Sequence, residues 1–249
     1  MMRFVLTSLA AALAASCGHA ETQPAAPYQA VTFKAADGLV VHGARYRTLH
    51  PKALILLFHQ AGSSKAEYAT IGPKLELAGY DALAIDQRSG GSMFGPNETA
   101  AALGRDASYL DAKQDLEAAL RWGETQKLPL ILWGSSYSAA LVFLVAADHP
   151  QALKGVLAFS PGEYLDHKDM VKQAAARVRV PVYVTSAKDP SEIAAARSIL
   201  AAARASVKVQ YVPEAGGVHG SSTLIETRDP AGAEANWRAA LAFLHRVAG

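Results

Sequence analysis

The chain has 249 residues, of which 51% are hydrophobic and 18% are charged. This length and apolar content suit one globular domain with a large buried core. The formal net charge is only +2 and the basic residues are scattered, so the composition argues against a nucleic-acid partner.

The N-terminus has the pattern of an export signal. Residues 1–20 contain one arginine, then an apolar run, then small residues, which is typical of a secretory signal peptide. Cleavage after Ala20 is one alternative; the other is that "LAASC" resembles a bacterial lipobox, in which Cys17 would carry a lipid anchor. Cys17 is the only cysteine, so no intramolecular disulfide can form. Both alternatives predict an exported protein, either periplasmic or secreted or held at a membrane as a lipoprotein, with 21–27 as a linker and 28–249 as the folded domain.

The apolar stretch of this signal is short for a transmembrane helix. A helix needs roughly twenty apolar residues to cross a bilayer. We therefore expect no integral membrane span in the mature protein.

After the linker, the chain alternates between strand and helix patterns. Two strands are expected at Val31–Lys34 and Leu39–Tyr46, around a turn at Asp37–Gly38. Six apolar runs follow: ALILLFH, DALAID, LPLILWG, GVLAFS, PVYVTSA and VKVQYV. Helices are expected at Ala66–Ala78, Tyr109–Thr125, Ser136–Asp148, Pro190–Ala203 and Gly232–Val247, with a shorter one over His167–Val178. Continuous apolar strands between helices predict an α/β fold with a mostly parallel central sheet covered on both faces.

Polar residues follow several of these strands. The carboxyl ends of parallel strands meet at one edge of a sheet, and ligands bind there. Ser136 follows LPLILW, Asp189 follows PVYVTSA, and His219 lies in the loop after VKVQYV. A serine, an acid and a histidine are therefore expected together, which is the set of groups that nucleophilic catalysis by serine requires.

The residues around Ser136 fit a sharp strand-to-helix turn. Gly134-Ser135-Ser136-Tyr137-Ser138 matches the nucleophile elbow G-x-S-x-G, with serine in the last position. The elbow needs small residues on both sides of the nucleophile because the backbone and the helix approach closely there. The same turn aims the start of the following helix, including the N–H of Tyr137, at a developing oxyanion.

Each member of the trio has a structural alternative. Ser136 could cap the helix that begins there, because serine is a good N-cap. "DPSE" is a capping box with proline at the first helical position, so Asp189 could also be a helix cap. His219 could be an ordinary loop histidine.

Three motifs of the chain resemble the α/β-hydrolase family over roughly residues 28–248. "SSYSA" resembles its nucleophile elbow, "LLFHQAGSS" its first oxyanion loop H-G-x-G with Gln60 in place of glycine, and "DQRSGGS" its D-x-R-G-x-G turn. The order of serine, acid and histidine is also the family's order. Within the family, the chain looks most like the small dienelactone-hydrolase-like and prolyl-oligopeptidase-like serine esterases.

This resemblance implies an α/β-hydrolase fold and a serine hydrolase that cleaves small or medium acyl esters through an acyl-enzyme. Ser136 would be the nucleophile, His219 the base and Asp189 the acid, with Glu163 as the next acid to consider. The segment 161–180 leaves room for one short helix, so we expect a minimal cap over the site.

The resemblance also implies an oxyanion hole built from backbone N–H groups. Tyr137 would supply one N–H. Ala61 would supply the other, and Gln60 is the alternative donor in place of Ala61. A small-molecule acyl compound is the expected partner. No motif indicates a metal or a cofactor.

Other functions and other motifs remain open at this stage. A serine peptidase or acyltransferase with the same triad is one alternative, and a non-catalytic hydrolase-like binding protein is another. Asp86 and Arg88 are interpreted as structural. The long segment 89–109 is expected near the active edge, either as part of the substrate pocket or as a flexible excursion.

Overall fold

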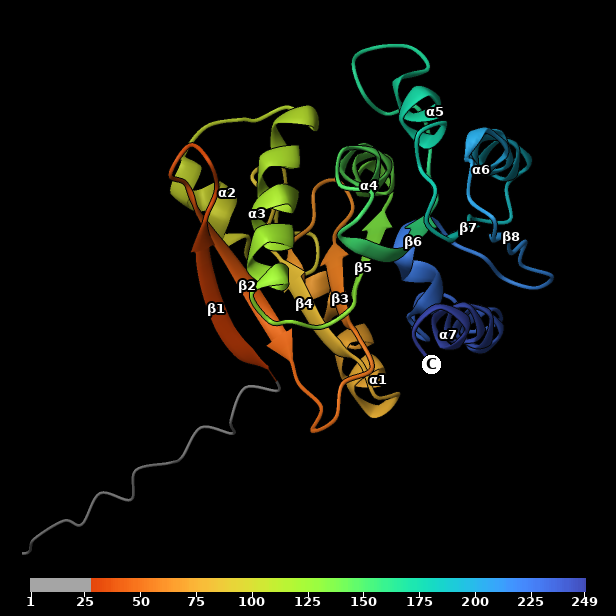
Figure 1. Cartoon of the computed structure of the whole chain (residues 1–249), viewed down its shortest axis with the longest axis horizontal. Coiled ribbons are helices and arrows are strands. Elements are labelled where there is room, and N and C mark those ends of the chain that lie inside the picture. The colour runs from red at the N-terminus through yellow and green to blue at the C-terminus, as the bar shows by residue number, and fades with distance from the viewer. Residues whose placement is uncertain (1–27) are drawn as a thin grey trace, which may run out of the picture.

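A computed structural model describes residues 28–249, and these form one sheet of eight strands in the order β1-β2-β4-β3-β5-β6-β7-β8 (Figure 1). β1 pairs antiparallel with β2, and β2 pairs antiparallel with β4. All other neighbours are parallel, which confirms the expected mostly parallel α/β fold. The strands are β1 (Gln29–Lys34), β2 (Val40–Tyr46), β3 (Leu54–Phe58), β4 (Asp81–Ile85), β5 (Leu130–Ser135), β6 (Leu153–Phe159), β7 (Val182–Thr185) and β8 (Lys208–Gln210).

Helices cover both faces of this sheet. α3, α4, α5 and α6 lie on one side, and α1 and α7 lie on the other (Figure 1). The helices are α1 (Ile71–Leu77), α2 (Glu98–Leu103), α3 (Lys113–Glu124), α4 (Tyr137–Asp148), α5 (Met170–Ala175), α6 (Pro190–Ala202) and α7 (Ala233–Ala248). Three short 3₁₀ turns complete the described part of the chain: η1 (Lys65–Tyr68), η2 (Leu110–Ala112) and η3 (Gly220–Leu224).

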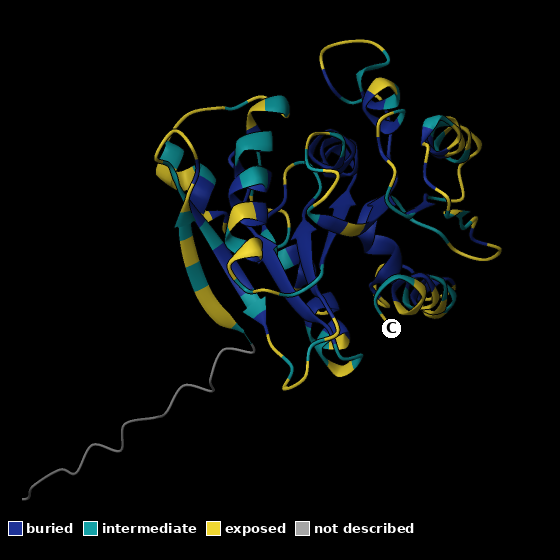
Figure 2. Cartoon of the chain, in the orientation of Figure 1, coloured by how far each residue is buried: buried dark blue, intermediate teal, exposed yellow. Residues whose placement is uncertain are grey.

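The central strands divide the interior into two cores. Successive side chains of a strand point to opposite faces. In β3, Leu54 and Leu56 pack on the side of α3 to α6, while Ile55 and Leu57 pack on the side of α1 and α7. All five residues of β3 are fully buried, as Figure 2 shows for the centre of the sheet. A strand buried on both faces is apolar throughout, which is why the sequence shows continuous runs rather than alternation.

Two expected elements differ in detail. The helix expected over Ala66–Ala78 is split into η1 and α1. The segment 89–109, interpreted as a loop, contains the six-residue helix α2. Asn97 caps α2 by accepting a hydrogen bond of 2.7 Å from the N–H of Ala100, and Gly104 ends it with a φ of 68°. A helix this short is set by its caps rather than by an apolar period, so the pattern of hydrophobic residues did not predict it.

The expected signal peptide, the linker and the lipid anchor at Cys17 lie outside the described residues. Within residues 28–249, no helix combines the length and the apolar character needed to cross a bilayer.

The interpretation of Asp86 and Arg88 as structural agrees with their contacts. Asp86 accepts hydrogen bonds from the backbone and the ammonium group of Lys65 and from the N–H of Glu98, so it joins the start of η1 to the start of α2. The Arg88 guanidinium is 3% exposed and pairs with the fully buried Asp115 of α3 at 2.8 Å. A second pair, to the half-exposed Asp37, measures 2.6 Å.

We predict that Asp115→Ala lowers the free energy of unfolding by about 3 kcal/mol, because it leaves most of a buried guanidinium charge uncompensated. Asp37→Ala removes the partner that water can replace, so its cost should be about 1 kcal/mol or less. Urea unfolding of both variants checks the difference. Equal losses would contradict the assignment of Asp115 as the principal partner of Arg88.

Candidate active site

Ser136 lies at the sharp turn between β5 and α4. Its backbone has φ 58° and ψ −121°, a conformation that residues other than glycine rarely adopt. The turn is held in place by the Ser136 N–H, which donates to the carbonyl of Phe159 on β6 at 2.8 Å. Only 8% of Ser136 is exposed. The strain and the position agree with the predicted elbow.

The residues two before and two after Ser136 are both small, and they are accommodated in different ways. A side chain at Gly134 would collide with the backbone oxygen of Ser138. Ser138, which stands where the pattern has glycine, is accommodated by hydrogen bonds. Its Oγ donates to the carbonyl of His59 at 2.5 Å and accepts from the side-chain amide of Gln87 at 2.7 Å. These two hydrogen bonds therefore allow a serine to stand where the elbow pattern has glycine.

His219 reaches Ser136 from the loop after β8. Its Nε2 lies 2.7 Å from Ser136 Oγ, although the two residues are 83 positions apart in the sequence. The loop turns at Gly216 and Gly217, with φ values of 60° and 91°. Glycine adopts such angles without a Cβ penalty. The glycine-rich loop therefore brings the imidazole to the edge of the sheet, as expected from the sequence.

The acid that contacts His219 is Glu192, not Asp189. The Nδ1 of His219 lies 2.8 Å from Glu192 Oε1. Asp189 is the N-cap of α6: its Oδ1 accepts from the N–H groups of Ser191 and Glu192, and its side chain faces solvent. The prediction that Asp189 orients His219 is therefore wrong, and its second interpretation as a helix cap is confirmed.

The reason is the direction of side chains on a helix. Asp189 Oδ1 accepts hydrogen bonds from the otherwise unpaired N–H groups of the first turn of α6. Glu192 is the third residue of α6, and its side chain points back toward the N-terminus of the helix. There its second oxygen, Oε2, accepts the N–H of Ala187 at 3.1 Å. Glu163, the next acid considered, accepts two N–H groups at the start of α5 and has no contact with His219 within residues 28–249.

Ser160 supports the Glu192 carboxylate from the end of β6. Burial works to raise the pKa of Glu192, but hydrogen bonds from His219 and Ser160 outweigh it and hold that pKa below its ordinary value. Ser160 Oγ also accepts the N–H of Gly220 at 2.9 Å, next to His219. Ser160 has a φ of 55°, so a second buried serine holds a strained backbone at this edge. Sequence reasoning missed both Glu192 and Ser160.

The loop after β3 lies against the same edge. His59 is fully buried, donates from Nδ1 to the carbonyl of Gln60 and accepts the N–H of Gln87 at Nε2. Burial lowers the pKa of His59 to about 4, so its ring is neutral at neutral pH and can accept that hydrogen bond.

Of the three N–H groups predicted for an oxyanion hole, one is already occupied. The N–H of Gln60 donates to the carboxylate of Glu67 at 2.7 Å, so Gln60 cannot replace Ala61 as a donor to the oxyanion. The N–H groups of Ala61 and Tyr137 have no hydrogen-bond partner among residues 28–249. Both therefore remain free for a ligand.

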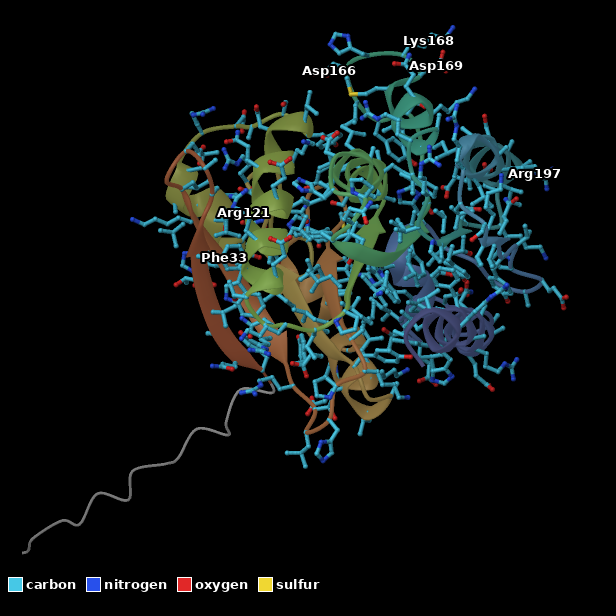
Figure 3. The ribbon with its side chains drawn as sticks, viewed as in Figure 1. Phe33, Arg121, Asp166, Lys168, Asp169 and Arg197 are labelled. Carbon is cyan, nitrogen blue, oxygen red and sulfur yellow. The ribbon has the colours of Figure 1, made fainter. Side chains whose placement is uncertain are left out.

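The segment between β6 and β7 carries one short helix, α5, as expected. Figure 3 shows Asp166, Lys168 and Asp169 on the loop that leads into α5, at the outer end of this segment and away from the sheet. The described residues thus provide a small cap rather than an extended lid.

Comparison with known proteins points to one family. A family model described as serine aminopeptidase, S33, matches residues 49–205. No curated protein sequence matches the chain significantly.

Solved structures share the fold at low sequence identity. A dienelactone hydrolase from Anabaena variabilis ATCC 29413 is 18% identical, with a TM-score of 0.68, over 90% of this chain and 100% of that one. An esterase of Pyrococcus furiosus is 17% identical, with a TM-score of 0.67, over 89% of this chain and 93% of that one. A thermostable carboxyl esterase from Bacillus coagulans is 14% identical, with a TM-score of 0.68, over 89% of this chain and 99% of that one.

The strained backbone of Ser136 generates a stability prediction that is independent of any reaction. Ser136→Gly should be more stable to unfolding than Ser136→Ala by about 1 kcal/mol, because glycine adopts the positive φ of the elbow without the Cβ penalty. Urea unfolding of the two variants measures the difference. An alanine variant as stable as the glycine variant would show that the elbow is not strained.

Proposed function

The chain belongs to the family described as serine aminopeptidase, S33, and from this premise we propose that it is a serine hydrolase that cleaves small or medium acyl esters through an acyl-enzyme. One observation carries the proposal: a single imidazole lies 2.7 Å from a serine hydroxyl and 2.8 Å from a carboxylate. The proposed roles are Ser136 as nucleophile, His219 as general base and Glu192 as the acid.

The carboxylate of Glu192 sets the proton positions of the ring. A carboxylate only accepts hydrogen bonds, so His219 donates to it from Nδ1. Nε2 is then unprotonated and accepts the hydroxyl of Ser136. Since the serine hydroxyl is a weak nucleophile at neutral pH, this acceptor is what activates it.

The reaction would proceed in two stages. Ser136 Oγ attacks the acyl carbonyl carbon while its proton passes to His219, and negative charge develops on the carbonyl oxygen. The free N–H groups of Tyr137 and Ala61 would receive that charge, and each such donor is typically worth roughly 3 to 4 kcal/mol in the transition state. His219 then protonates the leaving alcohol, and water cleaves the acyl-enzyme by the same route.

Ester substrates are supported by the likeness to two esterases and a dienelactone hydrolase, and by the small cap. A serine peptidase is the second candidate, favoured by the description of the matching family. A panel that compares p-nitrophenyl esters with aminoacyl p-nitroanilides separates the two. Export directed by residues 1–20, with Cys17 as an alternative lipid anchor, stays a prediction.

We predict that a fluorophosphonate probe labels Ser136 and that Ser136→Ala abolishes both labelling and ester hydrolysis, because the probe reacts only with an activated serine. Mass spectrometry of the labelled peptide identifies the residue. Ser206→Ala, at an exposed serine before β8, is the matched control and should label like the wild type. An unlabelled wild type would favour a non-catalytic binding protein.

Two substitutions on α6 separate the triad acid from the helix cap. Glu192→Gln should lower kcat by up to roughly 10⁴-fold, as the corresponding amide substitution does in a serine-protease triad, because an amide can donate to the ring and favour the wrong tautomer. Asp189→Asn should keep near-normal turnover, because asparagine caps a helix about as well as aspartate.

Steady-state kinetics and thermal melting of both variants make this comparison. Neither substitution should shift the melting temperature much. A collapse of turnover in Asp189→Asn, with normal turnover in Glu192→Gln, would contradict the assignment of Glu192.

A further inference from the structure

Glu67 is a buried carboxylate directly beside the proposed active site. It belongs to η1, follows the oxyanion loop by a few residues and is 1% exposed. No lysine or arginine forms a salt bridge with Glu67 within residues 28–249. A buried charge without a cation is unfavourable unless hydrogen bonds replace its hydration. The hydrogen-bond donors around Glu67 therefore show which segments its carboxylate holds together.

Those contacts lead to two functional segments. Glu67 Oε2 accepts the backbone N–H of Gln60, in the oxyanion loop, at 2.7 Å. Glu67 Oε1 accepts the hydroxyl of Ser135, the residue before the nucleophile, at 2.8 Å. Every partner is a donor, which is the arrangement that an ionised carboxylate requires.

Ser135 extends the connection to the histidine loop. Its Oγ accepts the N–H of Ser221, two residues after His219, at 2.8 Å. Between them, Gly220 has a φ of 67°, and a Cβ at that position would lie 2.5 Å from Ser135 Oγ. The close approach shows that the histidine loop is seated directly on Ser135.

We propose that Glu67 is a positioning residue for catalysis. Through Gln60 it fixes the turn that leaves the N–H of Ala61 free for the oxyanion, and through Ser135 it holds the loop that carries His219. This inference rests on the proposed function, because it assigns Glu67 a part in the same site.

The ionisation of Glu67 makes this role measurable. Burial raises the pKa of Glu67 to about 7, although hydrogen bonds from Gln60 and Ser135 and the nearby His219 oppose the shift. His219 and Tyr68 are the titratable groups that face it, and the charge of Glu67 adds to the burial that raises the pKa of Tyr68. A protonated Glu67 can accept from Gln60 only if its O–H donates to Ser135 Oγ, which reverses that hydrogen bond and leaves the Ser135 hydroxyl proton without its acceptor. Acidification should therefore weaken the hold of Glu67 on Ser135 and on the loop that carries His219.

The test begins with Glu67→Gln, which keeps the shape and removes the charge. An amide that accepts from Gln60 turns its NH₂ toward Ser135, so the Ser135 hydroxyl proton loses its acceptor. We expect kcat for a p-nitrophenyl ester to fall by roughly 10- to 100-fold with KM changed by less than about threefold, because the oxyanion contact is made in the transition state. Glu124→Gln, at an exposed glutamate of α3, is the matched control and should leave both constants unchanged.

The pH profile of the wild type supplies a readout that does not depend on the variant folding. Below about pH 7, log(kcat/KM) should rise with a slope greater than one, because Glu67 must be ionised in addition to the general base being unprotonated. Glu67→Gln should reduce this slope to one. A purely structural Glu67 would not change the slope.

The outcomes separate this inference from the proposed function. A wild type that neither labels with the fluorophosphonate probe nor hydrolyses esters refutes the proposed function, and this inference with it. An active wild type with a slope of one overturns the role of Glu67 alone. So does a folded Glu67→Gln variant that keeps kcat within about threefold of the wild type.

Discussion

The imidazole of His219 is held by two hydrogen bonds at once, one to Ser136 and one to Glu192. These partners come from positions 83 and 27 residues away in the sequence, so local structure cannot bring them together. The parallel sheet does so, because the segments that follow β5, β7 and β8 all leave it at one edge. Each hydrogen bond tolerates only a few tenths of an ångström. The surrounding elements must therefore fix three chain segments against one another.

The strained backbone at the carboxyl edge of the sheet follows from this requirement to fix three segments. Ser136 and Ser160 both have positive φ values, at the ends of the neighbouring strands β5 and β6. Ser160 Oγ accepts the N–H of Gly220, and Ser135 links the Glu67 carboxylate to the N–H of Ser221. The histidine loop is thus held from two sides by buried serines. In the proposed mechanism, this double attachment keeps the ring in place while its proton moves between Ser136 and the leaving group.

The sequence predicted the sheet because strands buried on both faces leave continuous apolar runs, and it predicted Ser136 and His219 because each stands in a distinctive local setting. The sequence did not predict the acid correctly, because the helix cap and the partner of His219 stand in one four-residue motif. In "DPSE", Asp189 caps α6 and Glu192 three residues later points back to the same helix end, so the capping box itself could have indicated Glu192. Glu67 and Ser160 left no such signal. Their roles depend on contacts with residues that are distant in the sequence, which only the folded chain brings together.

The central claim is that Glu192, and not Asp189, accepts the Nδ1 proton of His219. Proton NMR tests this without any substrate, because an imidazole N–H that donates to a carboxylate resonates far downfield. The account predicts that this resonance is present in the wild type and in Asp189→Asn, and absent in Glu192→Gln. A resonance that survives in Glu192→Gln and disappears in Asp189→Asn would contradict it.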